Sequence, residues 1–285
     1  MEDIASYYTN VEPSIYLLKE TLRQKPRKDF LEIIRQKRNI TDLDSFFLKD
    51  AVEFLRLSIL NLLSYKFLMS GNFLAWGEVT NYYGAFYAIN CLLRLKGFAL
   101  VHIDYVEERV LRIKIERVQG TCEYKISQWK KGNPHQFLWG KFSEFYPELC
   151  TLDLGEIFIK ERIRWNYDLY LPSQSMSHYA KKQARIRWEN NFLDPNFGVF
   201  ADPDAAIYYA DLMADTGYHE AGLGDFIQQC IEHLNKIAER SNYKAYYVSF
   251  YEEIASGIED FGSHPDTIRE VQSWLRSSIA NLEKI

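Results

Sequence analysis

The sequence predicts a mainly α-helical fold, in which a helical bundle carries an inserted antiparallel β-hairpin and additional helices toward the C-terminus. Apolar residues recur at helical spacing over most of the 285 residues, and one short stretch instead alternates apolar and polar residues. No internal repeat or low-complexity linker divides the chain. With 47% hydrophobic and 26% charged residues, its composition is that of a folded globular protein.

The N-terminal half predicts four helices. Residues 14–38 have helical periodicity that is interrupted at Pro26, so we expect two short helices there, because proline breaks a helix interior. Residues 41–71 predict one long helix whose middle is apolar almost all round, as in a central buried helix. A further helix over 72–97 ends with a glycine, which commonly terminates helices. The first two of these helices belong to an N-terminal segment, to which we assign residues 1–41.

Residues 109–129 carry a different period. Three apolar residues alternate with three charged ones before Gln119-Gly120, and Cys122, Tyr124 and Ile126 alternate with polar residues after it. Two alternating runs around a glycine predict an antiparallel hairpin with one polar face. Because a lone hairpin is marginally stable, its apolar face is expected to pack on helices or on another chain.

The second half of the chain returns to helical periodicity. Residues 130–140 predict a loop, and 141–171 predict a short helix followed by a longer one that ends before a proline. The predicted core, with its hairpin insertion, thus spans 42–172. The remainder, 173–285, is expected to be a C-terminal helical region packed on that core, irregular at first and helical from residue 204.

Composition and motifs exclude several classes of function. The net charge of −5 argues against a strongly basic coat for nucleic acid, although a local basic groove remains compatible with it. The sequence contains no glycine-rich phosphate loop and no G-x-S-x-G elbow. Six scattered histidines and four widely spaced cysteines predict no metal site, no cofactor and reduced, mostly buried thiols. No apolar run is long enough to span a membrane, so we expect a cytoplasmic protein.

The helix that contains "NYYGAFYAINCLLRLKG", residues 81–97, has two stripes at helical spacing. The first stripe requires only burial and consists of Tyr82, Phe86, Ile89 and Leu93. Every member of the second stripe can form hydrogen bonds: Tyr83, Tyr87, Asn90 and Arg94. An all-leucine face would pack at least as well, so the second stripe is expected to face water or a polar feature of another element.

The helix predicted to end near residue 171 supplies a candidate for that polar feature. Arg162 and Asn166 fall inside its apolar arc, whereas Arg164 falls on the outer side. A buried arginine needs a carboxylate, carbonyl groups or a phosphate. Arg162 is therefore either a structural residue or an anion-binding residue at a cleft or dimer seam. We expect the polar stripe of residues 83–94 to face this helix.

These two helices resemble the HEPN superfamily of small helical-bundle domains. In one branch of that family, a helix of the form Tyr-Tyr-x-x-Phe-x-Ala that ends in Leu-Leu-x-x-x-Gly precedes a helix with Arg, three residues, a polar residue and Tyr. The first motif is matched closely by Tyr82, Tyr83, Phe86 and Ala88, and the second by Arg162, Asn166 and Tyr167. Asn166 stands where Asp is more usual. The resemblance covers about residues 42–172.

The resemblance implies a dimer or a complex with a partner, and a role near RNA. Family ribonucleases carry an Arg one to two helical turns before a His, and no Arg in this sequence has a His at that offset. The first hypothesis is therefore a component of a prokaryotic stress, toxin–antitoxin or phage-defence system that binds RNA, a nucleotide or a partner subunit without cleavage. The alternatives are a degenerate metal-independent ribonuclease using Arg162 or Arg164, and a helical scaffold for protein interactions.

Overall fold

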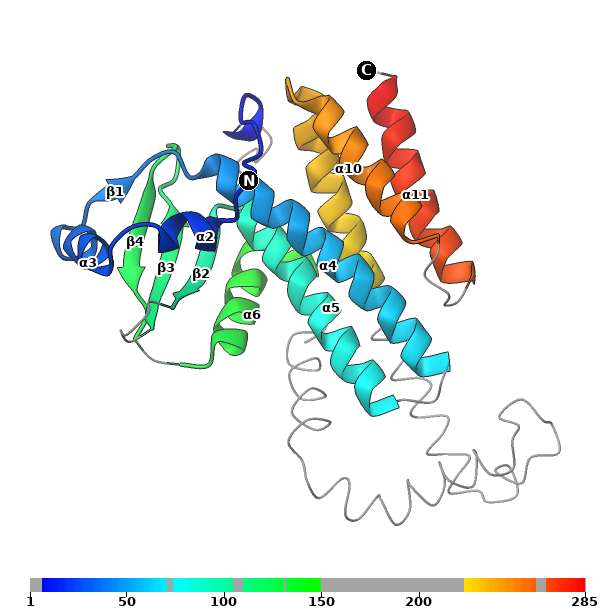
Figure 1. Ribbon diagram of the computed structural model, residues 1–285, viewed down its shortest axis with the longest axis horizontal. Helices are drawn as coiled ribbons and strands as arrows, with labels where there is room; N and C mark the ends of the chain where they lie inside the picture. Colours follow the sequence, from blue (N-terminus) through cyan, green and yellow to red (C-terminus); the bar gives the residue numbers. More distant parts are fainter. Residues whose placement is uncertain are drawn as a thin grey trace, which may run out of the picture.

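The computed structural model describes residues 7–70, 74–104, 110–130, 132–149, 223–259 and 265–284. Over these residues the fold is mainly helical, with one small antiparallel sheet of four strands. Figure 1 shows the sheet at one end of a group of long helices. The predicted class, mainly α with an antiparallel β element, is confirmed at this level, and the sheet is larger than the predicted hairpin.

The central layer is an antiparallel pair of long helices, α4 (Asp44–Ser70) and α5 (Leu74–Leu95), which matches the two helices predicted from periodicity. The helix formed by residues 223–240 packs on them together with α10 (Lys244–Gly257) and α11 (Pro265–Glu283), as Figure 1 shows. The apolar middle of α4 is buried as predicted, with Leu55, Ile59 and Leu63 fully inaccessible to solvent. This burial forms the larger of the two hydrophobic cores.

The sheet has the strand order β1-β4-β3-β2, and all its neighbouring strands are antiparallel. The predicted hairpin is confirmed as β3 (Leu111–Arg117) and β4 (Tyr124–Gln128), with Ile115 opposite Ile126. Two strands were not predicted: β2 (Phe98–Ile103) and β1 (Asn39–Ile40). The apolar run of β2 follows α5 directly and cannot be distinguished from a buried helix by pattern, while two residues in β1 carry no period.

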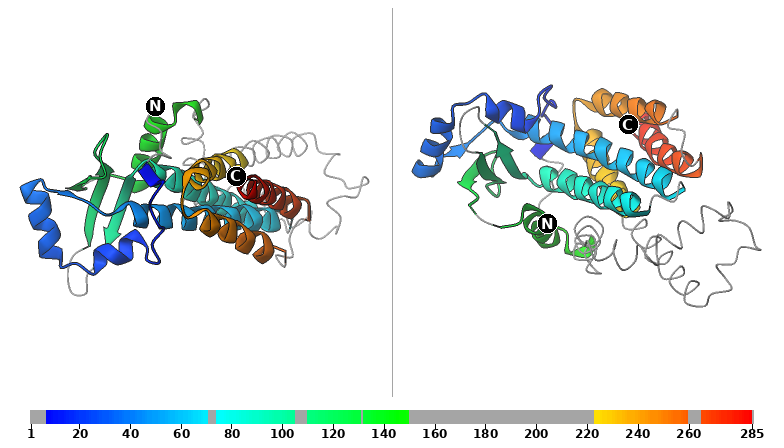
Figure 2. Two further views of the ribbon diagram at one scale, coloured as in Figure 1. Left: turned by 90° about the horizontal axis from the view of Figure 1, so that it is seen from above. Right: turned by 60° about the horizontal axis from the view of Figure 1, so that its bottom comes forward.

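The second core lies between one face of the sheet and the two short N-terminal helices. These helices are α2 (Leu18–Arg23) and α3 (Arg27–Gln36), with Pro26 between them as predicted. They cover the sheet with the buried side chains of Leu18, Leu22 and Phe30. Figure 2 shows α2 and α3 on one side of the sheet and α6 on the other. The apolar face of the hairpin therefore packs on helices of its own chain.

Helix α6 (Pro134–Phe145) corrects the prediction of a loop over residues 130–140. Asn133 is the N-cap, because its side chain accepts a hydrogen bond of 2.9 Å from the His135 backbone N–H, and Pro134 follows at the first helical position. Both residue types are favoured at these positions. The sequence Asn-Pro thus begins this helix, whereas our prediction placed it within a loop. Residues Pro147–Leu149 add a short 3₁₀ turn after α6.

The cysteines agree in part with the prediction of buried thiols. Cys91 and Cys230 are buried and free, and the Cys230 thiol donates to the Ala88 carbonyl oxygen at 3.3 Å. Cys122 is exposed in the connection between β3 and β4 and does not share the buried face of Tyr124 and Ile126. The alternating pattern of the second strand therefore begins at Tyr124, and our prediction wrongly included Cys122 in it. Cys150 lies outside the described residues.

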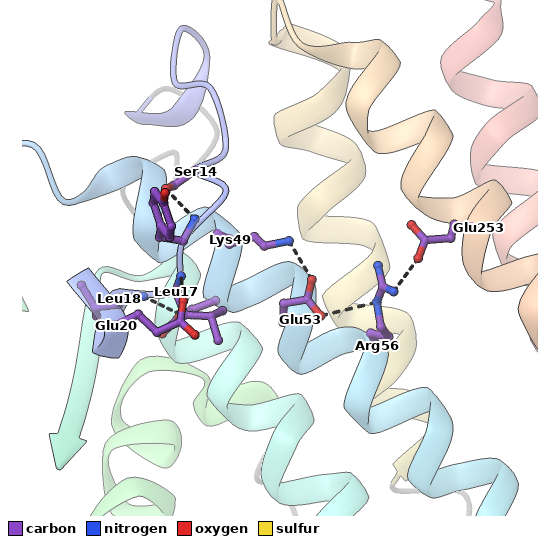
Figure 3. Close-up of polar contacts among 10 residues, drawn as sticks. Ser14, Leu17, Leu18, Glu20, Lys49, Glu53, Arg56 and Glu253 are labelled. Carbon is purple, nitrogen blue, oxygen red and sulfur yellow. Dashed lines mark hydrogen bonds and ion pairs between the residues drawn. The ribbon is translucent and has the colours of Figure 1, made fainter. Parts of the chain in front are cut away.

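A charged chain of contacts joins α10 to α4 at the surface. Arg56 of α4 donates to Glu253 of α10 at 2.6 Å and also lies 3.5 Å from Glu53, which in turn pairs with Lys49 (Figure 3). The Arg56 guanidinium lies over the Phe250 ring. The hydrogen bond from Arg56 and the positive charge of Arg56 lower the pKa of the Glu253 carboxyl group. These contacts are partly exposed, so they orient α10 and stabilise it only modestly.

His233, on the helix of residues 223–240, should make the fold less stable in mild acid. Its ring lies edge-on to the Tyr146 ring, with centroids 5.6 Å apart. Burial and the nearby Lys236 and Lys96 lower its pKa to about 4. The unfolded chain binds this proton near pH 6.5 and the folded chain does not until about pH 4, so stability falls as the pH is lowered between these values.

We expect this histidine to contribute a loss of about 2 kcal/mol between pH 7 and pH 4.5, allowing for its partial exposure. Urea unfolding followed by circular dichroism at both pH values measures the loss. In His233→Gln the loss should be smaller by this amount, because the variant side chain does not titrate. An equal loss of stability in the variant and the wild-type protein would contradict the assignment.

Candidate functional site

The predicted polar stripe of α5 is divided in the structure into an accessible half and a buried half. Tyr83 and Tyr87 are partly exposed, and their ring centroids lie 6.3 Å apart. The Tyr87 ring also stacks on Phe54 of α4, at 6.1 Å. Burial raises the pKa of Tyr87, and the nearby Tyr83 raises it further, so this hydroxyl stays protonated at neutral pH. These two tyrosines form the accessible part of the stripe.

Asn90 and Arg94 form the buried half and are satisfied within the fold. The Asn90 side-chain amide donates to the Phe86 carbonyl oxygen of its own helix at 2.7 Å. The Arg94 guanidinium pairs with Asp50 of α4 at 2.9 Å and donates to the Phe98 carbonyl oxygen at 3.1 Å. Arg94 is thus a structural residue that joins α4, α5 and β2. The hydrogen-bond partners of its guanidinium among the described residues are Asp50 and the Phe98 carbonyl group, and the helix predicted to face it lies outside the described residues.

Tyr82 corrects the expectation that the apolar stripe requires only burial. Its ring is buried, yet its hydroxyl oxygen lies 2.5 Å from Nδ1 of His135 on α6. The His135 ring also packs on Phe86, with centroids 4.4 Å apart, and lies edge-on to Tyr83 at 6.5 Å. A histidine therefore does meet the tyrosine-rich face of α5. The sequence signal that could have located it is the Asn-Pro helix start, which fixes His135 in the first turn of α6.

Four predicted site residues lie outside the described residues: Arg162, Arg164, Asn166 and Tyr167. The pairing of their helix with the tyrosine-rich face of α5 stays a prediction. Tyr83, Tyr87 and His135 are the described side chains that this helix would meet. None of these three is an arginine or a carboxylate, so an arginine that faced them would still need a counter-charge.

A pocket of about 310 Å³ opens where the end of α5, the end of β3 and α6 meet. Its lining combines two cationic residues, one carboxylate, one amide and three apolar or aromatic residues: Lys96, Arg117, Glu116, Gln119, Tyr7, Leu95 and Phe145. The volume lies at the lower end of the range for small-molecule sites. The wall carries both signs of charge. Its carboxylate, that of Glu116, lies 2.9 Å from the Lys114 ammonium group and 3.9 Å from the Lys141 ammonium group.

Arg117 in this wall is held from several sides. Its guanidinium forms an ion pair with Asp44 and donates to the Tyr124 hydroxyl at 2.6 Å. It also lies over the rings of Tyr7 and Tyr8, at 4.4 and 4.8 Å from their centroids. Only 5% of the Arg117 side chain is exposed, so its main role is to join the sheet to the start of α4.

Charge is distributed unevenly between the two parts of the chain. The segments that form α2, α3 and the sheet, residues 18–40 and 98–130, contain 14 Lys and Arg against 8 Asp and Glu, a net charge of +6. Because the whole chain has a net charge of −5, the residues outside these two segments carry a net charge of −11. We call residues 18–40 and 98–130 the sheet region. Sequence reasoning considered the total charge and so missed this asymmetry.

Many of the cations in the sheet region are exposed and have no ion-pair partner. Within the described residues, no carboxylate lies within 4.0 Å of eight exposed side chains: Arg23, Lys28, Arg35, Lys37, Arg38, Arg112, Lys125 and Lys130. Unpaired surface cations attract polyanions through long-range fields that depend on salt. The sheet region can therefore bind an acidic partner although the whole chain is acidic.

The described parts of the chain offer no three His, Cys, Asp or Glu residues placed to hold a metal ion. Among the helices described, none combines the length and the apolar character needed to cross a membrane. Comparison of the chain with protein-family models, curated proteins and solved structures found no match. The chemistry of the sites above is therefore the basis for any statement of function.

Proposed function

We propose that this protein is a HEPN-like component of a prokaryotic stress, toxin–antitoxin or phage-defence system, and that it binds RNA or a nucleotide without cleaving it. The observation that carries the proposal is the net charge of +6 on the sheet region, in which eight exposed cations pair with no described carboxylate, in a chain whose remainder carries −11. Neutralising phosphates with such cations is the main sequence-independent source of affinity for nucleic acid.

Binding without cleavage is favoured by the state of the described Arg and His residues. Arg94 is buried against Asp50 and cannot reach a phosphate. His135 has its Nδ1 beside the Tyr82 hydroxyl, and Nε2 of His102 is inaccessible to solvent. A general base must come within hydrogen-bonding distance of the proton that it removes. Nε2 of His102 as placed therefore cannot activate a 2′-hydroxyl without moving.

One observation favours the alternative of a degenerate ribonuclease. His102 of β2 and Arg112 of β3 are direct neighbours across the strands, and burial lowers the pKa of His102. A neutral histidine beside an exposed arginine is a pair that phosphodiester cleavage could use after a local rearrangement. The cleavage assay below therefore includes His102→Ala with Arg162→Ala and Arg164→Ala.

The proposal predicts RNA binding that weakens steeply with salt. Purified protein and fluorescein-labelled tRNA are titrated by fluorescence anisotropy at several salt concentrations. We expect Arg112→Glu and Lys125→Glu each to weaken binding and to reduce the magnitude of the salt slope by about 1, because each removes about one phosphate contact. Arg269→Glu is the matched control, because Arg269 is exposed on α11 in the acidic part of the chain.

The same samples, analysed on denaturing gels, report cleavage. Intact RNA after incubation supports binding without cleavage, whereas cleavage that disappears in His102→Ala, Arg162→Ala or Arg164→Ala supports the ribonuclease instead. Absence of binding to tRNA, total RNA and nucleoside triphosphates would overturn the proposal and favour a helical scaffold for protein partners. An equal effect of Arg269→Glu and Lys125→Glu would show that the sheet region is not the binding surface.

A further inference from the structure

One face of the sheet is only partly covered by the other residues that the structure describes. We call it the outer face: it is the face opposite α2 and α3, and it carries alternate residues of β2, β3 and β4. Helix α6 covers one end, where Phe137 and Phe145 each lie 6.0 Å from Phe98 between ring centroids. The remainder carries mostly polar and charged side chains: His102, Arg112, Lys114, Glu116, Lys125 and Ser127, with Leu100.

Trp129 lies directly after β4 on this face and is held in a fixed orientation, with Phe137 of α6 at 6.0 Å between ring centroids. Its backbone N–H donates to the Arg112 carbonyl oxygen at 2.9 Å, which extends the pairing of the strands by one residue. The indole stacks nearly parallel to the His102 ring, with an angle of 14° and a centroid distance of 6.0 Å. It remains partly exposed. A tryptophan that is both fixed and partly exposed offers a preorganised flat surface.

Positive charge surrounds this indole. The Arg112 guanidinium lies 5.7 Å from the ring centroid, and neither Arg112 nor Lys125 has an ion pair with a described residue. Lys130 follows the tryptophan and is exposed. Arg112 and Lys114 occupy alternate positions of β3, roughly 6.6 Å apart on one face. The carboxylate of Glu116 is paired with Lys114, so Arg112, Lys125 and Lys130 give the outer face a net positive charge.

We propose that the outer face binds a single-stranded segment of nucleic acid, with one base stacked on Trp129 and the backbone phosphates beside Arg112 and Lys125. This inference rests on the proposed function and assigns it a site and a ligand class. A flat aromatic surface next to cations suits an unpaired base, because every base has a π-face while the cations follow the phosphates. A duplex keeps its bases stacked inside and could use only the cations.

The two contributions can be separated in one experiment. Labelled 12-nucleotide single-stranded RNA and a hairpin duplex of equal charge are titrated by anisotropy against wild type, Trp129→Ala, Trp129→Phe and Arg112→Gln. We expect Trp129→Ala to weaken single-strand binding by about 5- to 100-fold, the range for one stacked base, with an unchanged salt slope. Trp129→Phe should recover part of the affinity. Arg112→Gln should reduce the magnitude of the slope by about 1.

Trp76→Ala is the matched control, because Trp76 is 66% exposed on α5 and lies outside the sheet region. This variant should bind like wild type. Circular dichroism reports whether Trp129→Ala is folded, and if it is not, Trp129→Phe and Arg112→Gln carry the test. Wild-type affinity in both Trp129 variants, or preference for the duplex, would overturn this inference and leave the proposed function standing. Absence of binding to any RNA or nucleotide would overturn both.

Discussion

Replacing Asp50 with alanine is expected to lower the free energy of unfolding by about 3 to 5 kcal/mol, because it leaves the charge of Arg94 buried without a partner. The two side chains are only 9% and 5% exposed, and their ion pair measures 2.9 Å. The other carboxylate oxygen of Asp50 accepts a hydrogen bond of 3.0 Å from the Leu18 backbone N–H at the start of α2. The variant therefore also loses the attachment of α2 to α4. Urea unfolding at neutral pH measures the change.

Two further variants separate burial from charge in this experiment. Glu253→Ala breaks the exposed ion pair with Arg56 and should lower the free energy of unfolding by less than about 1 kcal/mol. The double variant Asp50→Leu with Arg94→Met replaces both charges by apolar groups and should be more stable than Asp50→Ala alone. If Asp50→Ala were no less stable than Glu253→Ala, the buried ion pair would not be what fixes the junction of these elements.

Gly97→Ala is expected to lower the free energy of unfolding by about 2 to 4 kcal/mol for two independent reasons. Gly97 has a φ of 73°, in the left-handed region that disfavours side chains. A Cβ at this position would also lie 2.6 Å from Cβ and 2.8 Å from Nε of Arg117. Arg117 cannot move away easily, because its ion pair with Asp44 and its hydrogen bond to Tyr124 hold it.

Gly120→Ala provides a matched control for the backbone contribution. Gly120 has a φ of 75°, and a Cβ there would meet no atom within 4 Å. We expect Gly120→Ala to lower the free energy of unfolding by about 1 kcal/mol, from backbone conformation alone. The difference between the two variants measures the steric contact with Arg117. Equal losses of stability would contradict the close packing of Gly97 on β3.

Periodicity predicted the elements whose period persists over many residues. The long helices α4 and α5 and the alternating strands β3 and β4 were found because each repeats its pattern several times. Strand β1, with two residues, has no pattern to detect, and β2 has a continuous apolar run that suits a helix as well as a strand. Recognising Asn133 as an N-cap would have located α6.

Partners across the fold were less predictable than the elements. The sequence identified Arg94 as an unusual member of a buried helix and assigned Tyr82 to burial alone, and it predicted neither partner: Asp50 lies 44 residues from Arg94, and His135 lies 53 residues from Tyr82. Which of many carboxylates or histidines approaches a given side chain depends on the packing of α4 and α6 against α5. Arg162 and Asn166 remain predicted partners of the tyrosine-rich face. The basic sheet region depends on charges from two separate segments that only the sheet brings together.

The pairing of β1 with β4 determines where this chain can be divided. β1 precedes α4 and the other strands follow α5, so the sheet is completed by residues from both sides of a helical hairpin. A fragment that starts at residue 42, the boundary suggested by sequence, would expose the edge of β4 and remove α2 and α3 from the apolar face. Such a fragment should self-associate through its open edge. Deletion and domain-exchange experiments therefore need to keep residues 18–40 together with the hairpin.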